Sequence, residues 1–286
     1  MRWDEIADGL RASPFYRERL GAARPRELAA CPLTTRDDLL RDQLAHLPLG
    51  TRRPEGAPRP VRVGVTGTGG GLLVLAWSAA ELARERAAGA RLLRRLGVAP
   101  GMRIANVLPG ALTTPGALLL GDVVEELGGL DVPLGTEDAR AAWELVDRVT
   151  PEVLVLDDAA TFLAAAPPAA RPGWRGIVRR GTGHAATSIP AAAGFTGWQR
   201  GWLAVPEATS FVAGTCAEGR HHADEGVIAE VVDAHGTPLP PGRDGVLALT
   251  PLGLEAPLVR FATGIAVREC ARPCPCGADE ASLELR

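Results

Sequence analysis

The feature that most constrains the fold is an alternation of short apolar segments with helical segments between residues 61 and 156. The apolar segments have the length of buried strands, and the segments between them carry helical spacing or helix-capping residues. We expect strands at 61–65, 72–77, 102–108, 130–134 and 152–156, and helices at 78–96, 116–127 and 137–149. Strands that alternate with helices predict βαβ layers and a parallel sheet, an α/β fold.

Beyond about residue 210 the pattern changes to short β-type runs at 227–232, 246–249 and 258–261, with a turn-rich loop at 233–243. Short strands separated by turns are typical of an antiparallel meander. We therefore predict three parts: an N-terminal helical segment (1–60, with helices around 3–10 and 36–44), an α/β core (61–205), and a smaller C-terminal β-rich subdomain (206–286).

The chain contains no lysine, since all 31 basic residues are arginine. No Schiff base can therefore form, and no ammonium group can bind a nucleotide phosphate as a point charge. The net charge of −3 and the lack of a basic run predict no nucleic-acid or membrane partner. The N-terminus has no apolar signal stretch, which predicts a cytoplasmic protein.

Five cysteines occur, and three of them, Cys270, Cys274 and Cys276, fall within seven positions. An odd number without an export signal favours metal ligation over a disulfide framework.

Several segments, taken in order, resemble the phenylacetate–CoA ligase family of the adenylate-forming superfamily. Residues 13–20 (SPFYRERL) and 32–39 (PLTTRDDL) are similar to its N-terminal signatures, and residues 65–71 stand where the family has its SSGTTGKP phosphate loop. Residues 216–233, 257–261 (PLVRF) and 274–277 (CPCG) resemble its C-terminal motifs. The resemblance implies the fold of an adenylate-forming enzyme's N-terminal domain.

Measured against the same family, most of the ATP-handling groups are missing. The loop keeps Thr66, Gly67, Thr68 and Gly70, but Gly71 replaces the family's lysine; it reads either as a relaxed anion- or thioester-binding loop or as a flexible turn. Ile265 stands at the position of the ribose-binding aspartate, and it cannot accept hydrogen bonds from hydroxyl groups. The resemblance also predicts that the family's C-terminal lid domain is absent, so we expect no use of ATP and magnesium.

A possible metal site remains. The resemblance and the donor types predict a structural zinc ion bound by Cys216, His221, Cys274 and Cys276, with Cys270 and His222 as substitutes. The alternative is a set of free surface thiols near a turn.

Three further polar residues are candidate catalytic groups. His184 could be a general base or a loop histidine, Glu207 is retained from the family's YGLSE element, and Arg260 could pair with an acidic ligand group or a structural carboxylate.

These observations favour an enzyme derived from a ligase, acting without ATP on an acyl or aryl thioester of CoA or an acyl carrier protein, by cyclisation, transfer or isomerisation. One alternative is a non-catalytic, zinc-stabilised scaffold, possible as a homodimer. Another is a residual ligase whose lid is supplied by a second chain.

Overall fold

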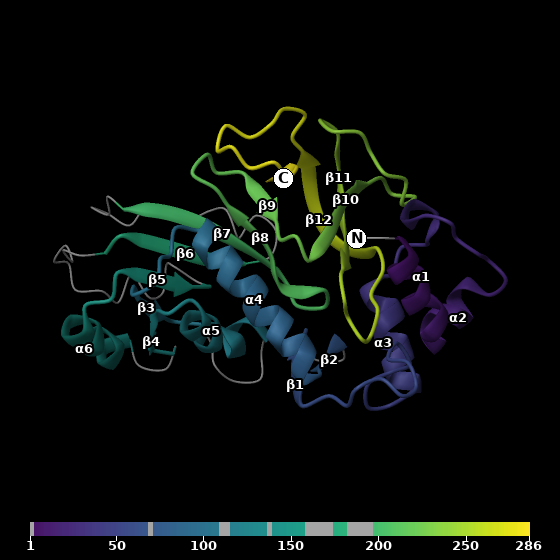
Figure 1. Cartoon of the computed structure of the whole chain (residues 1–286), viewed down its shortest axis with the longest axis horizontal. Helices are drawn as coiled ribbons and strands as arrows, with labels where there is room; N and C mark the ends of the chain where they lie inside the picture. The colour runs from purple at the N-terminus through teal and green to yellow at the C-terminus, as the bar shows by residue number, and fades with distance from the viewer. Residues whose placement is uncertain (1–2, 68–70, 109–114, 136–138, 158–173, 182–196) are drawn as a thin grey trace.

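The computed structural model describes residues 3–67, 71–108, 115–135, 139–157, 174–181 and 197–286. Within these residues, the main sheet has the strand order β10-β11-β12-β13-β9-β8-β7-β6-β5-β3-β4, and β1 and β2 pair separately as an antiparallel hairpin (Figure 1). The strands are β1 Arg62–Thr66, β2 Leu73–Trp77, β3 Arg103–Asn106, β4 Leu130–Pro133, β5 Val153–Leu156, β6 Gly176–Gly181, β7 Trp198–Val205, β8 Thr209–Thr215, β9 His221–Ala223, β10 Val227–Val232, β11 Asp244–Pro251, β12 Phe261–Glu269 and β13 Ser282–Leu285. The helices are α1 Trp3–Ala12, α2 Pro14–Leu20, α3 Arg36–Ala45, α4 Ala79–Arg95, α5 Pro115–Glu126 and α6 Ala139–Val149, with a 3-10 turn at Leu28–Ala30.

The strands β4, β3, β5, β6 and β7 are parallel. Strands β3, β4 and β5 belong to the predicted alternation of strands and helices, whereas β6 and β7 were not predicted. At β5 both faces of the sheet are buried. Val153 and Val155 of β5 join the core that includes α4 and α5, whereas Leu154 and Leu156 join a second core with Trp143 of α6. Side chains of successive strand residues point to opposite faces, so an unbroken apolar run is what a strand covered on both sides requires.

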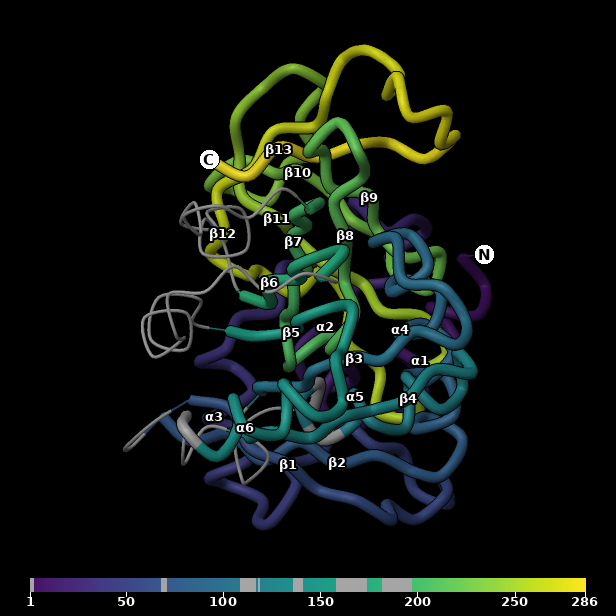
Figure 2. The backbone as a smooth tube through the Cα atoms, turned by 90° about the vertical axis from the view of Figure 1, so that its left-hand side faces the viewer, coloured from purple at the N-terminus to yellow at the C-terminus, as the bar shows by residue number. Residues whose placement is uncertain are grey.

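The remaining strands, β8 to β13, are antiparallel and continue the same sheet. All of them lie beyond residue 206, and the division of the chain into three parts stays a prediction. Strand β13 lies between β12 and β9 and pairs with both, so it connects the β10–β11–β12 meander to the rest of the sheet. Figure 2 shows these yellow and green segments stacked at one end of the molecule.

Helix α4 begins at a capping box, as predicted. The Ser78 hydroxyl accepts from the Glu81 N–H, and the Glu81 carboxylate accepts from the Ser78 N–H. The helix crosses β8 and α5 (Figure 1) at Gly89, where a Cβ would lie 2.5 Å from a Val123 methyl group and 2.8 Å from the Phe211 ring. Glycine is therefore needed for this close approach.

The N-terminal helices pack beside the β-rich part, with Thr34 bridged to Phe261 of β12. The predicted strand at 258–261 is wrong for its first three residues, since β12 begins at Phe261. Arg260 has a φ of 49°, a left-handed conformation that a strand does not contain.

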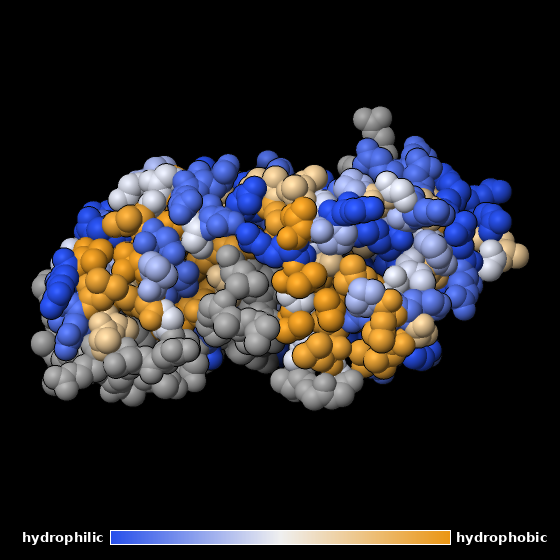
Figure 3. All heavy atoms as spheres, turned by 90° about the horizontal axis from the view of Figure 1, so that it is seen from below, coloured by the Kyte–Doolittle hydropathy of each residue, from blue (hydrophilic) through white to orange (hydrophobic). Residues whose placement is uncertain are grey.

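None of the described helices has both the length and the apolar character needed to cross a membrane. Apolar side chains do reach the surface in places, as the lower face in Figure 3 shows. The most exposed large ones among the described residues include Leu44, Leu47, Val61, Val63 and Leu72, at the end of α3 and on or next to the β1–β2 hairpin. The homodimer stays a prediction.

Candidate functional site

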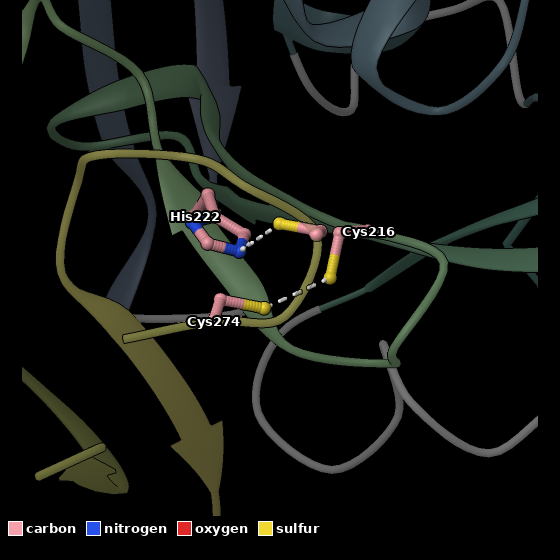
Figure 4. Close-up of side chains that lie close together, drawn as sticks. Cys216, His222 and Cys274 are labelled. Carbon is pink, nitrogen blue, oxygen red and sulfur yellow. Dashed lines mark hydrogen bonds between the residues drawn. The ribbon is translucent and has the colours of Figure 1, made fainter. Parts of the chain in front are cut away.

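Three cysteines and one histidine gather where the antiparallel strands meet the loop before β13. Cys216 follows β8, His222 lies in β9, and Cys274 and Cys276 come from the loop between β12 and β13. Their ligand atoms all lie within 4.8 Å of one another. The Cys216 and Cys274 sulfurs are 3.6 Å apart, and the Cys276 sulfur is 3.4 Å from the His222 Nε2. Figure 4 shows Cys216, Cys274 and His222 pointing toward a common centre. This cluster could hold a metal ion.

The histidine of the cluster is His222, and the choice of His221 is corrected. Neighbouring side chains on a strand point to opposite faces, so only one of the two histidines in β9 can face the cysteines. His221 is 1% exposed, and its Nε2 has no hydrogen-bond partner among the described residues. The sequence spacing alone could not decide between adjacent histidines.

An arginine from another part of the chain binds the glycine-rich loop, and no sequence pattern predicts this contact. Arg36, at the start of α3, donates to the carbonyl oxygens of Thr66 and Gly71 at 2.9 and 2.5 Å. It also donates to the Glu207 carboxylate at 3.2 Å. The guanidinium thus ties together the two ends of the loop.

The same carboxylate accepts a hydrogen bond of 3.1 Å from the Thr66 hydroxyl. Gly67 has a φ of 87°, and a Cβ there would lie 2.1 Å from an Arg36 nitrogen. The predicted loop residues Thr66 and Gly67 and the candidate Glu207 therefore lie together, with Arg36 among them. Thr68, Gly70 and His184 lie outside the described residues.

Arg260 pairs with a carboxylate of the protein itself, which is the second of the two roles considered for it. It is 2% exposed, and its side chain donates to the Glu230 carboxylate at 3.1 Å and to the carbonyl oxygens of Ala29, Cys31 and Gly236 at 3.0, 2.8 and 2.6 Å. With these donors bound to protein acceptors, Arg260 has no free edge for a ligand. The catalytic role predicted for it is therefore corrected to a structural one.

One buried acid was missed by the sequence reasoning. Glu85 of α4 is 6% exposed and accepts a hydrogen bond of 3.1 Å from the Ser210 N–H. Burial raises the pKa of its carboxyl group to about 7, and the hydrogen bonds from Thr209 and Ser210 oppose this only in part. In the sequence Glu85 looks like any glutamate in a helix, because its neighbours Arg84 and Arg86 suggest an exposed face.

Glu85→Gln should change how stability depends on pH. The raised pKa means that the folded state binds the proton more tightly, so Glu85 stabilises the protein at acid pH and destabilises it as pH rises toward and past 7. Between pH 5 and pH 8 the wild type should lose about 2–3 kcal/mol of unfolding free energy relative to the glutamine variant.

Urea unfolding at several pH values measures this difference. Glu18→Gln, at an exposed position of α2, is the control and should follow the wild type at every pH. Parallel curves for Glu85→Gln and the wild type would contradict the expectation.

No protein-family model and no curated protein sequence matches this chain. Its fold does match solved structures. A 2-hydroxyisobutyryl-CoA ligase, in an open conformation with 2-HIB-AMP and CoA, superposes with a TM-score of 0.84 at 19% identity, over 97% of this chain and 70% of that chain. The same ligase in its postadenylation state with 2-HIB-AMP gives a TM-score of 0.82 at 19% identity, over 97% of this chain and 65% of that chain. MatB from Rhodopseudomonas palustris gives 0.59 at 16% identity, over 83% of this chain and 49% of that chain. The fold predicted from the sequence is confirmed.

Proposed function

We propose that this chain, which has the fold of the acyl-CoA ligases of the adenylate-forming superfamily, acts without ATP on an acyl or aryl group already activated as a thioester. The thioester would be carried by CoA or by an acyl carrier protein. Cyclisation, transfer or isomerisation of such a group needs positioning and charge stabilisation but no nucleotide.

The position of Arg36 carries the proposal. A phosphate loop binds its ligand through backbone N–H groups and a cation that faces the phosphates. Here the Arg36 guanidinium instead binds the loop's own carbonyl groups and the Glu207 carboxylate. The charges of Arg36 and Glu207 are thus paired within the protein. Gly71 and Ile265 stand where the resemblance implies the phosphate-binding lysine and the ribose-binding carboxylate, and they supply neither group.

The thioester part of the proposal is supported by the fold. The 2-hydroxyisobutyryl-CoA ligase was solved with an acyl adenylate and CoA bound. A chain of the same fold could lose adenylation and still keep the surfaces that bind the acyl group and the thioester.

Ligand-dependent thermal unfolding tests the proposal. An aryl-CoA thioester at about 100 times its Kd should stabilise the protein by about 2.7 kcal/mol, which corresponds to a rise of about 5 °C or more in Tm. MgATP should leave Tm unchanged, and no ATP–pyrophosphate exchange should occur with aromatic acids. A rise in Tm with MgATP alone would contradict the proposal, and exchange upon addition of a separate lid chain would support the residual ligase.

A restored variant provides the positive control. Gly71→Lys and Ile265→Asp reinstate the two missing groups, and Arg36→Met removes the guanidinium from the loop. A Cβ at Gly71 meets no atom within 4 Å, and Ile265 is half-buried, so both positions can accept the new side chains. We expect this triple variant to gain a Tm rise with MgATP that the wild type lacks.

We also propose that the Cys216–His222–Cys274–Cys276 cluster binds zinc. Tetrahedral bonds of about 2.3 Å to sulfur and about 2.1 Å to nitrogen place two sulfurs about 3.8 Å apart, and a sulfur and a nitrogen about 3.6 Å apart. The Cys216–Cys274 sulfur pair at 3.6 Å and the Cys276 sulfur–His222 Nε2 pair at 3.4 Å are near these spacings. Four protein ligands leave no open position for water, so the role of such an ion would be structural. A zinc-stabilised protein that binds no thioester would be the scaffold alternative.

A further inference from the structure

A cleft of about 560 Å³ opens on the side of α4 that faces the β-rich part, and Glu85 lines it. Its walls include apolar side chains from the segments around β10 and β11, among them Val227, Leu252 and Leu254. None of the residues of the metal cluster, and none of the described residues of the phosphate loop, lines this cleft. It is therefore a different place from the sites described above.

The charges along the cleft are unbalanced. Five acids and two arginines line it, and Arg91 is bound to Asp224 at 2.8 Å and to Glu225 at 3.3 Å. Glu81 is bound to Arg53, which lies outside the lining. Among the described residues, no arginine or histidine forms an ion pair with Glu85. A buried carboxyl group without a counter-charge costs folding free energy, so it marks a place where a ligand could supply the charge.

We propose that this cleft binds a small organic cation with an apolar body, whose ammonium group pairs with the Glu85 carboxylate. The ligand's hydrocarbon part lies against the apolar wall, and its charge completes the ion pair that the fold leaves open. Charge-assisted hydrogen bonds to a buried carboxylate are stronger than neutral ones, which selects an amine over an alcohol of the same shape.

Binding is coupled to the proton on Glu85. A carboxyl group with a pKa of about 7 is partly protonated at neutral pH, and an arriving cation favours its ionised form. An amine that binds at pH 7 should therefore release a fraction of a proton. The other charged groups that line the cleft are Glu81, Arg84 and Arg91 on α4 itself, and Glu5, Asp224 and Glu225 on the segments packed against it. Among them the Asp224 carboxylate raises the pKa of Glu85 further.

Isothermal titration of the full chain with 2-phenylethylamine tests the proposal, with 2-phenylethanol as the neutral probe of the same shape. We expect the amine to bind roughly tenfold more tightly than the alcohol. Heats measured in two buffers of different ionisation enthalpy should report proton release with the amine only. Equal affinities for the two probes, or no binding of the amine, would overturn the proposal.

Two variants separate the ion pair from the shape of the cleft. Glu85→Gln retains an acceptor for the Ser210 N–H and should reduce amine affinity to that of the alcohol, without proton release. Leu252→Trp leaves Glu85 in place, fills part of the cleft, and should weaken both probes. Amine binding that survives either variant unchanged would place the ligand elsewhere.

Discussion

Stripping the metal from the Cys216–His222–Cys274–Cys276 cluster is expected to lower the unfolding free energy by several kcal/mol, on the order of 5 kcal/mol. The cluster joins the β8–β9 turn to the loop that leads into β13. The proposed zinc ion would bind the folded state more tightly than the unfolded chain, so its binding free energy would add to stability. Without it, the contacts that tie the loop to its neighbours include the hydrogen bonds from Arg220 to the carbonyl oxygens of Arg272 and Pro273 and the exposed ion pair of Arg95 with Glu280.

The experiment compares Cys274→Ser with Cys270→Ser, because both cysteines lie in the loop between β12 and β13 and Cys270 is outside the cluster. Metal analysis should give about one zinc per chain for the wild type and for Cys270→Ser, and far less for Cys274→Ser. Urea unfolding with and without a chelator should show the loss of stability. A wild type that contains no metal, and whose unfolding free energy is the same with and without the chelator, would disprove the zinc proposal.

Arg260→Met should be nearly as damaging, at about 3–5 kcal/mol. The methionine fills much of the space but leaves the Glu230 carboxylate, whose side chain is 13% exposed, without its partner. It also leaves the carbonyl oxygens of Ala29, Cys31 and Gly236 without their donor. Unsatisfied buried acceptors carry the full cost of lost hydration.

Arg268→Met, on the strand β12 that directly follows Arg260, is the matched control. Arg268 pairs with Asp244 at 2.8 Å, but both side chains are well exposed, at 37% and 60%. Such surface pairs contribute about 0–1 kcal/mol. Adding Glu230→Gln to Arg260→Met should recover part of the lost stability, because the unpaired charge is removed. Equal losses for the Arg260 and Arg268 variants, measured by urea unfolding, would contradict the structural role.

Strands β3, β4 and β5 of the parallel half could be predicted because their signals are local. Strand β5 is a continuous apolar run, and the start of α4 is indicated by Ser78 and Glu81, which are three residues apart and form a capping box. Strands β6 to β9 and β13 were not predicted. Residues 198–205 and 209–215 contain polar and small residues whose strand conformation is decided by neighbours in the sheet.

The site could be predicted only in part, because its decisive contacts join residues far apart in the chain. Three of the four metal ligands followed from the cysteine cluster and the resemblance, whereas the choice between His221 and His222 depends on which face of β9 each occupies. Nothing in the sequence brings Arg36 to Gly71, or Arg260 to Ala29, a separation of 231 residues. The raised pKa of Glu85 follows from burial that no local pattern reveals.

The position of β13 between β12 and β9 has a consequence for how the chain folds during synthesis. Residues 3–269 leave the ribosome before residues 282–285. The meander and the parallel half can therefore form while the edges of β9 and β12 that face each other are still unpaired. Open strand edges on a nascent chain invite pairing with other chains, and contacts of long sequence separation form slowly. The nascent protein should therefore need a chaperone until β13 inserts, and zinc that holds the preceding loop would speed that insertion.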